Sequence, residues 1–148
     1  MSSPPQLIAI DPDDYHAAHV GRTASGQQFF ITNPFEPSRD LQGHAFVARF
    51  LFNAAGQLCD ATIDDVGPRR TVDRDAWQKL LEQREAELGW ITRQRIVIAP
   101  FEVERFGLKF GLIPRPPEGD DDESWWVELH PGNYMAFHEP WDSGWYDT

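Results

Sequence analysis

Two runs of alternating apolar residues, separated by a short turn that contains glycine, lie near the middle of this sequence. Residues 45–52 place four apolar side chains on one face of an extended strand: Phe46, Ala48, Phe50 and Phe52. After the turn at residues 53–56, residues 58–63 place Cys59, Ala61 and Ile63 together on one face. Such runs around a turn predict an antiparallel hairpin with one apolar face, where a buried Cys59 thiol would be inert.

Further segments have the same strand-like character, and prolines or glycines separate several of them. They are residues 16–22, 27–32, 95–99, 101–105, 108–113, 124–129 and 134–138. The run at 95–99 is the most apolar and β-branched, so we expect it in the centre of a sheet. Pro131 and Gly132 favour a type II turn, which predicts a last hairpin formed by residues 124–129 and 134–138.

One segment, residues 75–88, has helical periodicity instead. Its apolar side chains recur at helical spacing and form one stripe: Trp77, Leu80, Leu81 and Leu88. Asp75 can cap the first turn with Gln78 three residues later, and Gly89 favours an end to the helix. The sequence therefore predicts an α+β fold: mainly antiparallel sheet built from hairpins, with about eight strands and one principal helix packed on a face.

The organisation of the chain indicates a single domain over residues 1–148. We expect residues 1–6 to be frayed and residues 114–123 to form an acidic, proline-rich loop. The single cysteine excludes an internal disulfide, and no apolar stretch reaches the roughly 18 residues of a membrane span. The first residues lack the basic and apolar regions of an export signal. We therefore expect a cytoplasmic protein that does not engage membranes.

Negative charge is concentrated toward the C-terminus. The chain has 13 Lys and Arg against 24 Asp and Glu, which gives a net charge of −11. Residues 116–148 contribute −9 of this, because they contain nine acidic residues and no Lys or Arg. An acidic surface repels phosphate backbones, so we do not expect nucleic acid as a partner. Such a surface attracts basic proteins at long range instead.

The same C-terminal third is rich in aromatic residues, which are frequent anchors of protein interfaces. We therefore interpret the chain as a non-enzymatic acidic recognition protein that binds a basic protein partner, as an inhibitor, an immunity protein or an adaptor would. The predicted binding residues are Glu139, Trp141, Asp142, Trp145, Tyr146 and Asp147, with Asp120, Asp121, Asp122 and Glu123 as a steering loop. An alternative is that Trp141 or Trp145 folds back and closes one end of the core.

Two other functions are compatible with the sequence. A small-molecule-binding domain or a hydrolase-like enzyme could place a pocket near the last hairpin, with His130, His138, Glu139 and Asp142 as acid–base candidates. A homodimeric structural domain could pair through an exposed sheet edge or the aromatic tail. No nucleophile or phosphate-loop motif is present, and His16 and His19 would point to opposite faces of a strand. We therefore expect neither a cofactor nor a metal site.

Overall fold

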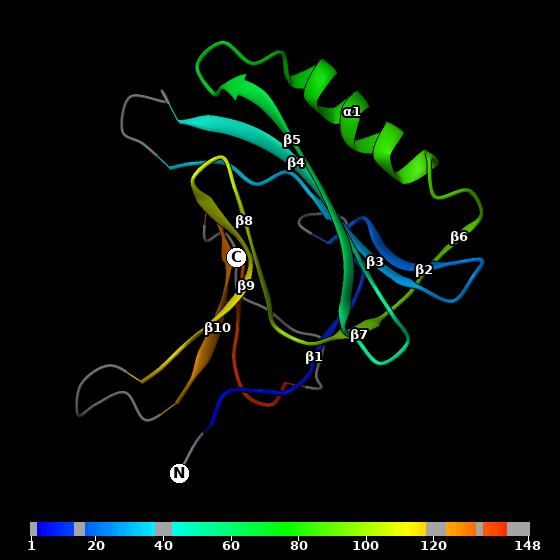
Figure 1. Ribbon diagram of the computed structural model, residues 1–148, viewed down its shortest axis with the longest axis vertical. Helices are drawn as coiled ribbons and strands as arrows, with labels where there is room; N and C mark the ends of the chain where they lie inside the picture. The colour runs from blue at the N-terminus through cyan, green and yellow to red at the C-terminus, as the bar shows by residue number, and fades with distance from the viewer. Residues whose placement is uncertain (1–2, 14–16, 38–42, 118–123, 133–134, 142–148) are drawn as a thin grey trace.

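The computed structural model of the protein describes residues 3–13, 17–37, 43–117, 124–132 and 135–141 (Figure 1). Within these ranges the chain forms eleven strands in three antiparallel sheets and one α-helix. The predicted α+β class, with antiparallel sheet and one main helix, is confirmed. The one helix in the described part of the chain is too short and too polar to cross a membrane.

The largest sheet has five strands in the order β5-β4-β3-β2-β6. Their bounds are β2 Val20–Thr23, β3 Gln28–Thr32, β4 His44–Phe52, β5 Leu58–Pro68 and β6 Ile91–Arg93. β4 and β5 form the hairpin that the alternating apolar residues predict, and β5 continues past its predicted end at residue 63. All five residues of β3 are buried, because this sheet is covered on both faces.

Helix α1 (Arg74–Ala86) lies on one face of the five-stranded sheet (Figure 1). Its buried Leu81 and partly buried Trp77 pack against the apolar side chains of that face: Phe29, Ile31 and Val47. The indole Nε1 of Trp77 also donates a hydrogen bond of 2.7 Å to the carbonyl oxygen of Phe46. The helix is therefore held to the sheet by the apolar stripe that its sequence predicts.

The N-cap of α1 differs from the prediction. Asp73, and not Asp75, has the extended backbone of a cap residue, with φ −80° and ψ 113°. Its Oδ1 accepts hydrogen bonds from the backbone N–H groups of Asp75 and Ala76, at 2.9 and 3.3 Å. The helix consequently begins one residue before the predicted start, and Asp75 lies in its first turn.

A four-stranded sheet in the order β11-β10-β9-β8 covers the opposite face of the five-stranded sheet. Its strands are β8 Phe101–Arg105, β9 Leu108–Arg115, β10 Trp126–His130 and β11 Ala136–Phe137. The ring centroids of Phe50 and Phe101 lie 4.6 Å apart, and those of Phe46 and Phe110 lie 5.0 Å apart. The main hydrophobic core therefore lies between these two sheets, on the side away from the helix.

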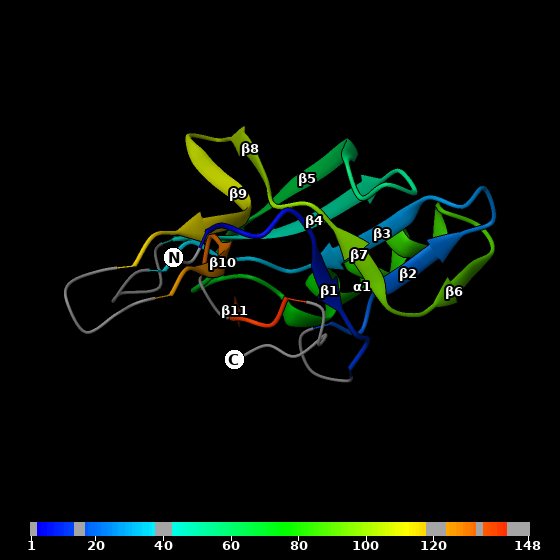
Figure 2. The ribbon, with the colours of Figure 1, turned by 90° about the horizontal axis from the view of Figure 1, so that it is seen from below.

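The third sheet pairs β1 (Ile8–Ile10) with β7 (Ile96–Ile98), which lie side by side in both views (Figure 2). The side chains of Ile8, Ile10, Ile96 and Ile98 are buried in the main core. The 95–99 segment was expected in the centre of a sheet. It pairs with the short strand β1 instead, a partner that the sequence pattern does not reveal.

Two further local predictions need correction. Cys59 is exposed and not buried, because a register shift between Leu51 and Phe52 pairs Phe52 with Leu58. This bulge turns Leu58 toward the core and Cys59 toward solvent. The predicted loop at 114–123 also begins later than expected, because β9 continues to Arg115. The acidic residues 118–123 of that loop lie outside the described residues.

Candidate functional site

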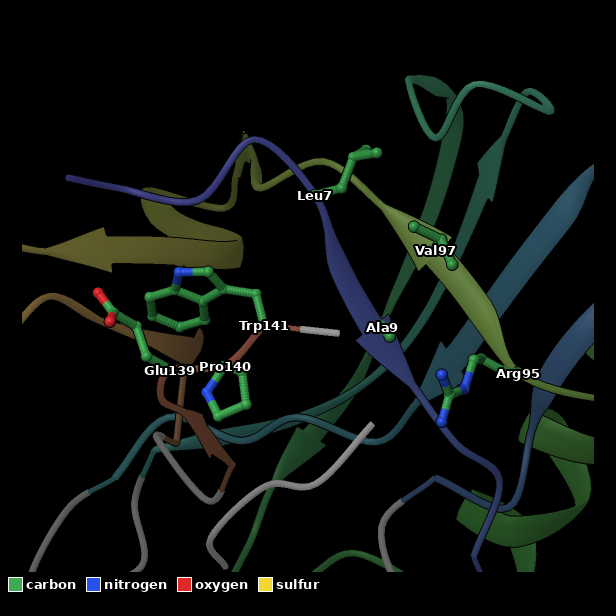
Figure 3. A pocket seen from close by; sticks show the side chains of 7 residues that line it. All are labelled: Leu7, Ala9, Arg95, Val97, Glu139, Pro140 and Trp141. Atoms are coloured by element: carbon green, nitrogen blue, oxygen red, sulfur yellow. The ribbon is translucent and has the colours of Figure 1, made fainter. Parts of the chain in front are cut away.

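An open groove of about 740 Å³ lies over the outer face of the β1–β7 sheet (Figure 3). Side chains from three distant parts of the chain line it: Leu7, Ala9, Arg95, Val97, Glu139, Pro140 and Trp141. Its volume falls within the range of ligand-binding clefts, and most of its lining residues are apolar. This groove is our candidate binding site.

Strand alternation creates the floor of the groove. Because the isoleucines of β1 and β7 point into the core, the residues between them point outward. Ala9 of β1 lies directly opposite Val97 of β7, and Leu7 precedes β1. Leu7 and Val97 are 43% and 36% exposed, whereas most large apolar side chains of this protein are buried. The small Ala9 side chain leaves the groove open between its larger neighbours.

One wall of the groove is the segment that follows β11. The backbone N–H of Ala9 donates a hydrogen bond of 2.8 Å to the carbonyl oxygen of Trp141, which fixes this segment beside β1. The partly buried Trp141 ring packs against the main core and also lines the groove. Trp141 therefore closes one edge of the core, as the alternative interpretation predicts, while keeping a surface that a ligand can reach.

The two charged residues of the groove lie on opposite sides of β1 (Figure 3). Arg95 donates hydrogen bonds from Nε and Nη2 to the two carboxylate oxygens of Asp11, at 2.7 and 2.9 Å. The hydrogen bonds and charge of Arg95 hold the pKa of Asp11 below its ordinary value. Glu139 is exposed at the other side. A ligand would therefore meet a neutralised guanidinium on one side and a solvated carboxylate on the other.

The strand edges at the groove already have hydrogen-bond partners. The side chain of the fully buried Gln28 accepts from the Val97 N–H at 2.6 Å and donates to the Val97 carbonyl oxygen at 2.9 Å. At the other edge of the β1–β7 sheet, the N–H of Ala9 already donates to the carbonyl oxygen of Trp141. A partner could not add a strand at these positions, so it would bind through side-chain contacts in the groove.

Two of the predicted binding residues, Glu139 and Trp141, lie in this groove. The others lie outside the described residues: Asp142, Trp145, Tyr146, Asp147, Asp120, Asp121, Asp122 and Glu123. The ranges that the structure does not describe hold nine acidic residues and one basic residue, so they carry −8 of the net charge of −11. The described surface is accordingly much closer to neutral than the whole chain.

The residues of the alternative pocket are distributed differently. His130 lies on β10, where its Nε2 is 3.0 Å from Oε2 of Glu128, and Trp126 Nε1 donates to the other oxygen at 2.8 Å. Burial raises the pKa of Glu128, but hydrogen bonds from Trp126 and His130, together with electrostatic attraction to His130 and Arg115, hold the pKa below its ordinary value. His138 is exposed, and neither histidine lines the groove that contains Glu139. Asp142 lies outside the described residues.

The floor of the groove is not among the residues predicted from sequence. Leu7, Ala9 and Val97 belong to short apolar runs, which are typical of strands buried on both faces. Only the pairing of β1 with β7 leaves one face of these runs uncovered. Among the described residues, no group of three or more His, Cys, Asp or Glu side chains could hold a metal ion.

Comparison with known proteins yields no relative: no family model, no curated protein and no solved structure matches this chain.

Proposed function

We propose that this protein is a non-catalytic recognition module that binds a basic, partly apolar segment of a partner protein in the groove over β1 and β7. The observation that carries the proposal is the pairing of exposed apolar side chains, Leu7 and Val97, with the solvated carboxylate of Glu139 in one groove. Arg95 adds little repulsion toward a basic partner, because Asp11 neutralises its charge.

The charge of the whole chain supports the same choice of partner. A net charge of −11 accelerates encounters with basic proteins through long-range attraction, and salt screens this effect. The groove would then select segments whose apolar side chains fit beside Ala9 and Trp141. A cytoplasmic inhibitor or adaptor that covers a basic surface of its target would use this chemistry.

Synthetic peptides of defined charge and hydrophobicity test the proposal directly. Fluorescein-labelled peptides that alternate leucine with lysine, leucine with glutamate, or serine with lysine are titrated with the full chain and followed by anisotropy. We expect binding of the leucine–lysine peptide, weaker binding of the serine–lysine peptide and none of the leucine–glutamate peptide. Raising the salt from low to physiological concentration should weaken the binding. Equal binding of all three peptides would reject the proposal.

Variants with matched controls locate the binding surface. Glu139→Gln removes the carboxylate of the groove, and Glu104→Gln removes an exposed carboxylate of β8 outside it. Val97→Lys introduces a positive charge into the groove, and Thr92→Lys introduces one on the exposed surface of β6. We expect Glu139→Gln and Val97→Lys to weaken peptide binding more than their controls do. Equal losses within each pair would mean that only net charge matters and that the groove is not the site.

A further inference from the structure

A second, smaller cavity lies at the start of β2, away from the groove. It has a volume of about 320 Å³ and is lined by Pro12, Asp13, Ala18, His19 and Arg93. His19 directly precedes β2, and Arg93 is the last residue of β6, which pairs with β2. None of these residues lines the groove over β1 and β7. The cavity is therefore independent of the function proposed above.

Glu85 of α1 organises two of the side chains that line this cavity. Its Oε1 accepts a hydrogen bond of 2.7 Å from Arg93 Nη2, and its Oε2 lies within hydrogen-bond distance of His19 Nδ1. The Glu85 side chain is 13% exposed and that of His19 is 15% exposed. One largely buried carboxylate thus holds both the imidazole and the guanidinium in place.

This arrangement determines which nitrogen of His19 carries the proton. An ionised carboxylate such as that of Glu85 can only accept hydrogen bonds. Nδ1 of His19 is then the donor of this contact, and Nε2 is the ring nitrogen that does not face Glu85. Carboxylates orient histidines in this way at ligand-binding and metal-binding sites.

The cavity combines three kinds of polar group within a small space. Within the described residues, Nε2 of His19 makes no hydrogen bond, and Arg93 bonds Glu85 through Nη2 alone. Asp13 adds a carboxylate whose Oδ1 accepts the backbone N–H of Ala17 at 3.3 Å. The lining of one cavity therefore includes a guanidinium, an imidazole and a carboxylate. They complement a molecule that has a carboxylate next to a hydrogen-bond donor.

We infer that this cavity binds a small amino or hydroxy carboxylic acid through His19, Arg93 and Asp13. The carboxylate of the ligand pairs with the guanidinium of Arg93. Its amino or hydroxyl group donates to Nε2 of His19, and an ammonium group also pairs with Asp13. A cavity of this size is at the lower end of the range for ligand sites, which matches a small metabolite and not a peptide.

The test uses the full chain and a panel of small acids. Amino acids and the corresponding hydroxy acids are titrated by calorimetry, together with their amides, which lack the carboxylate, and simple carboxylic acids, which lack the donor. We expect saturable binding of at least one amino or hydroxy acid, with its two truncated analogues binding about tenfold more weakly or worse. A panel in which no acid binds, or in which the truncated analogues bind equally well, would overturn the inference.

Nitrogen NMR of the imidazoles separates ligand binding from a purely structural His19–Glu85 contact. Ligand should shift the Nε2 resonance of His19 and leave the resonances of His44, an exposed histidine paired with Asp65, unchanged. Arg93→Gln should weaken binding about tenfold, because it removes the charge that holds the carboxylate. Arg70→Gln, at an exposed arginine outside the cavity, should bind normally. An unshifted His19, or an unaffected Arg93→Gln, would show that the contact only fastens α1 to the sheet.

Discussion

Gln28 is a buried polar residue. Its side chain bonds the edge of β7 that does not pair with β1, where a neighbouring strand would otherwise bond. Its amide group bonds both the N–H and the carbonyl oxygen of Val97, and its Nε2 also donates to the carbonyl oxygen of Asn53 at 3.1 Å. A single side chain thus links the five-stranded sheet to β7. Because unpaired buried polar groups are costly, this link helps to hold the floor of the groove in position.

Replacing Gln28 by leucine tests this link. Gln28→Leu introduces an apolar side chain of similar size and leaves two backbone groups of Val97 without their partner. We expect the free energy of unfolding to fall by about 1–3 kcal/mol for each orphaned group. Urea denaturation measures the loss, and Gln83→Leu on the exposed face of α1 should change stability by no more than about 0.5 kcal/mol. Equal effects of the two variants would contradict the bridging role.

At the level of elements, α1 shows that a correct helix prediction can still misplace the cap. The stripe of Trp77 and Leu81 docks on the sheet as its spacing predicts. Two aspartates near the start, Asp73 and Asp75, are both suitable caps by residue type. The backbone decides between them, because only Asp73 is extended and places its carboxylate over free N–H groups.

The two aspartates provide a matched pair of variants. Asp73→Ala removes the cap and should lower the free energy of unfolding by about 1 kcal/mol. Asp75→Ala removes only a favourable charge in the first turn, which contributes about 0.3–1 kcal/mol at low salt. Chemical denaturation in moderate salt, which screens the charge effect, should therefore show the larger loss for Asp73→Ala. A larger loss for Asp75→Ala would mean that Asp75 is the cap after all.

At the level of the whole molecule, three carboxyl groups connect ionisation to stability. Hydrogen bonds from Arg95 and from Arg84 lower the pKa values of Asp11 and Glu87, respectively. The pKa of Glu128 is lowered as well, because hydrogen bonds from Trp126 and His130 and electrostatic attraction to His130 and Arg115 together exceed the opposing effect of burial. These groups lie on different elements: Asp11 follows β1, Glu87 follows α1, and Glu128 lies in β10. Acid should therefore weaken several parts of the structure together.

The sign of the pH dependence follows from these lowered pKa values. In the unfolded chain the carboxyls titrate near pH about 4, so below that pH the unfolded state binds more protons than the folded state. The stabilisation is present above this pH and is lost as the pH falls through the folded pKa values. Urea midpoints measured from neutral to acidic pH should show this loss. Asp11→Asn should make this loss of stability smaller, because it removes a carboxyl group whose pKa Arg95 lowers. A stability that rises toward acidic pH would contradict the argument.

The candidate site was only partly predictable from sequence. Two residues of its C-terminal wall, Glu139 and Trp141, are among the predicted binding residues, because they combine the charge and aromatic character that binding surfaces favour. Its floor was missed, because the apolar run around Val97 has the pattern of a strand buried on both faces. The cavity beside His19 was missed as well, since His19 and Glu85 are 66 residues apart and no local pattern relates them.

The amino-acid sequence alone determined the local elements of this protein. Side-chain periodicity and turn residues specify the β4–β5 hairpin and the docked face of α1, because both depend on contacts between residues close in the chain. Only the tertiary structure decided which distant segments meet. The pairing of Ile8 with Ile98, the attachment of Trp141 beside β1 and the contact of His19 with Glu85 join segments that are far apart in sequence. Such contacts depend on how whole sheets pack together, and so neither the groove nor the cavity could be predicted in full from local patterns.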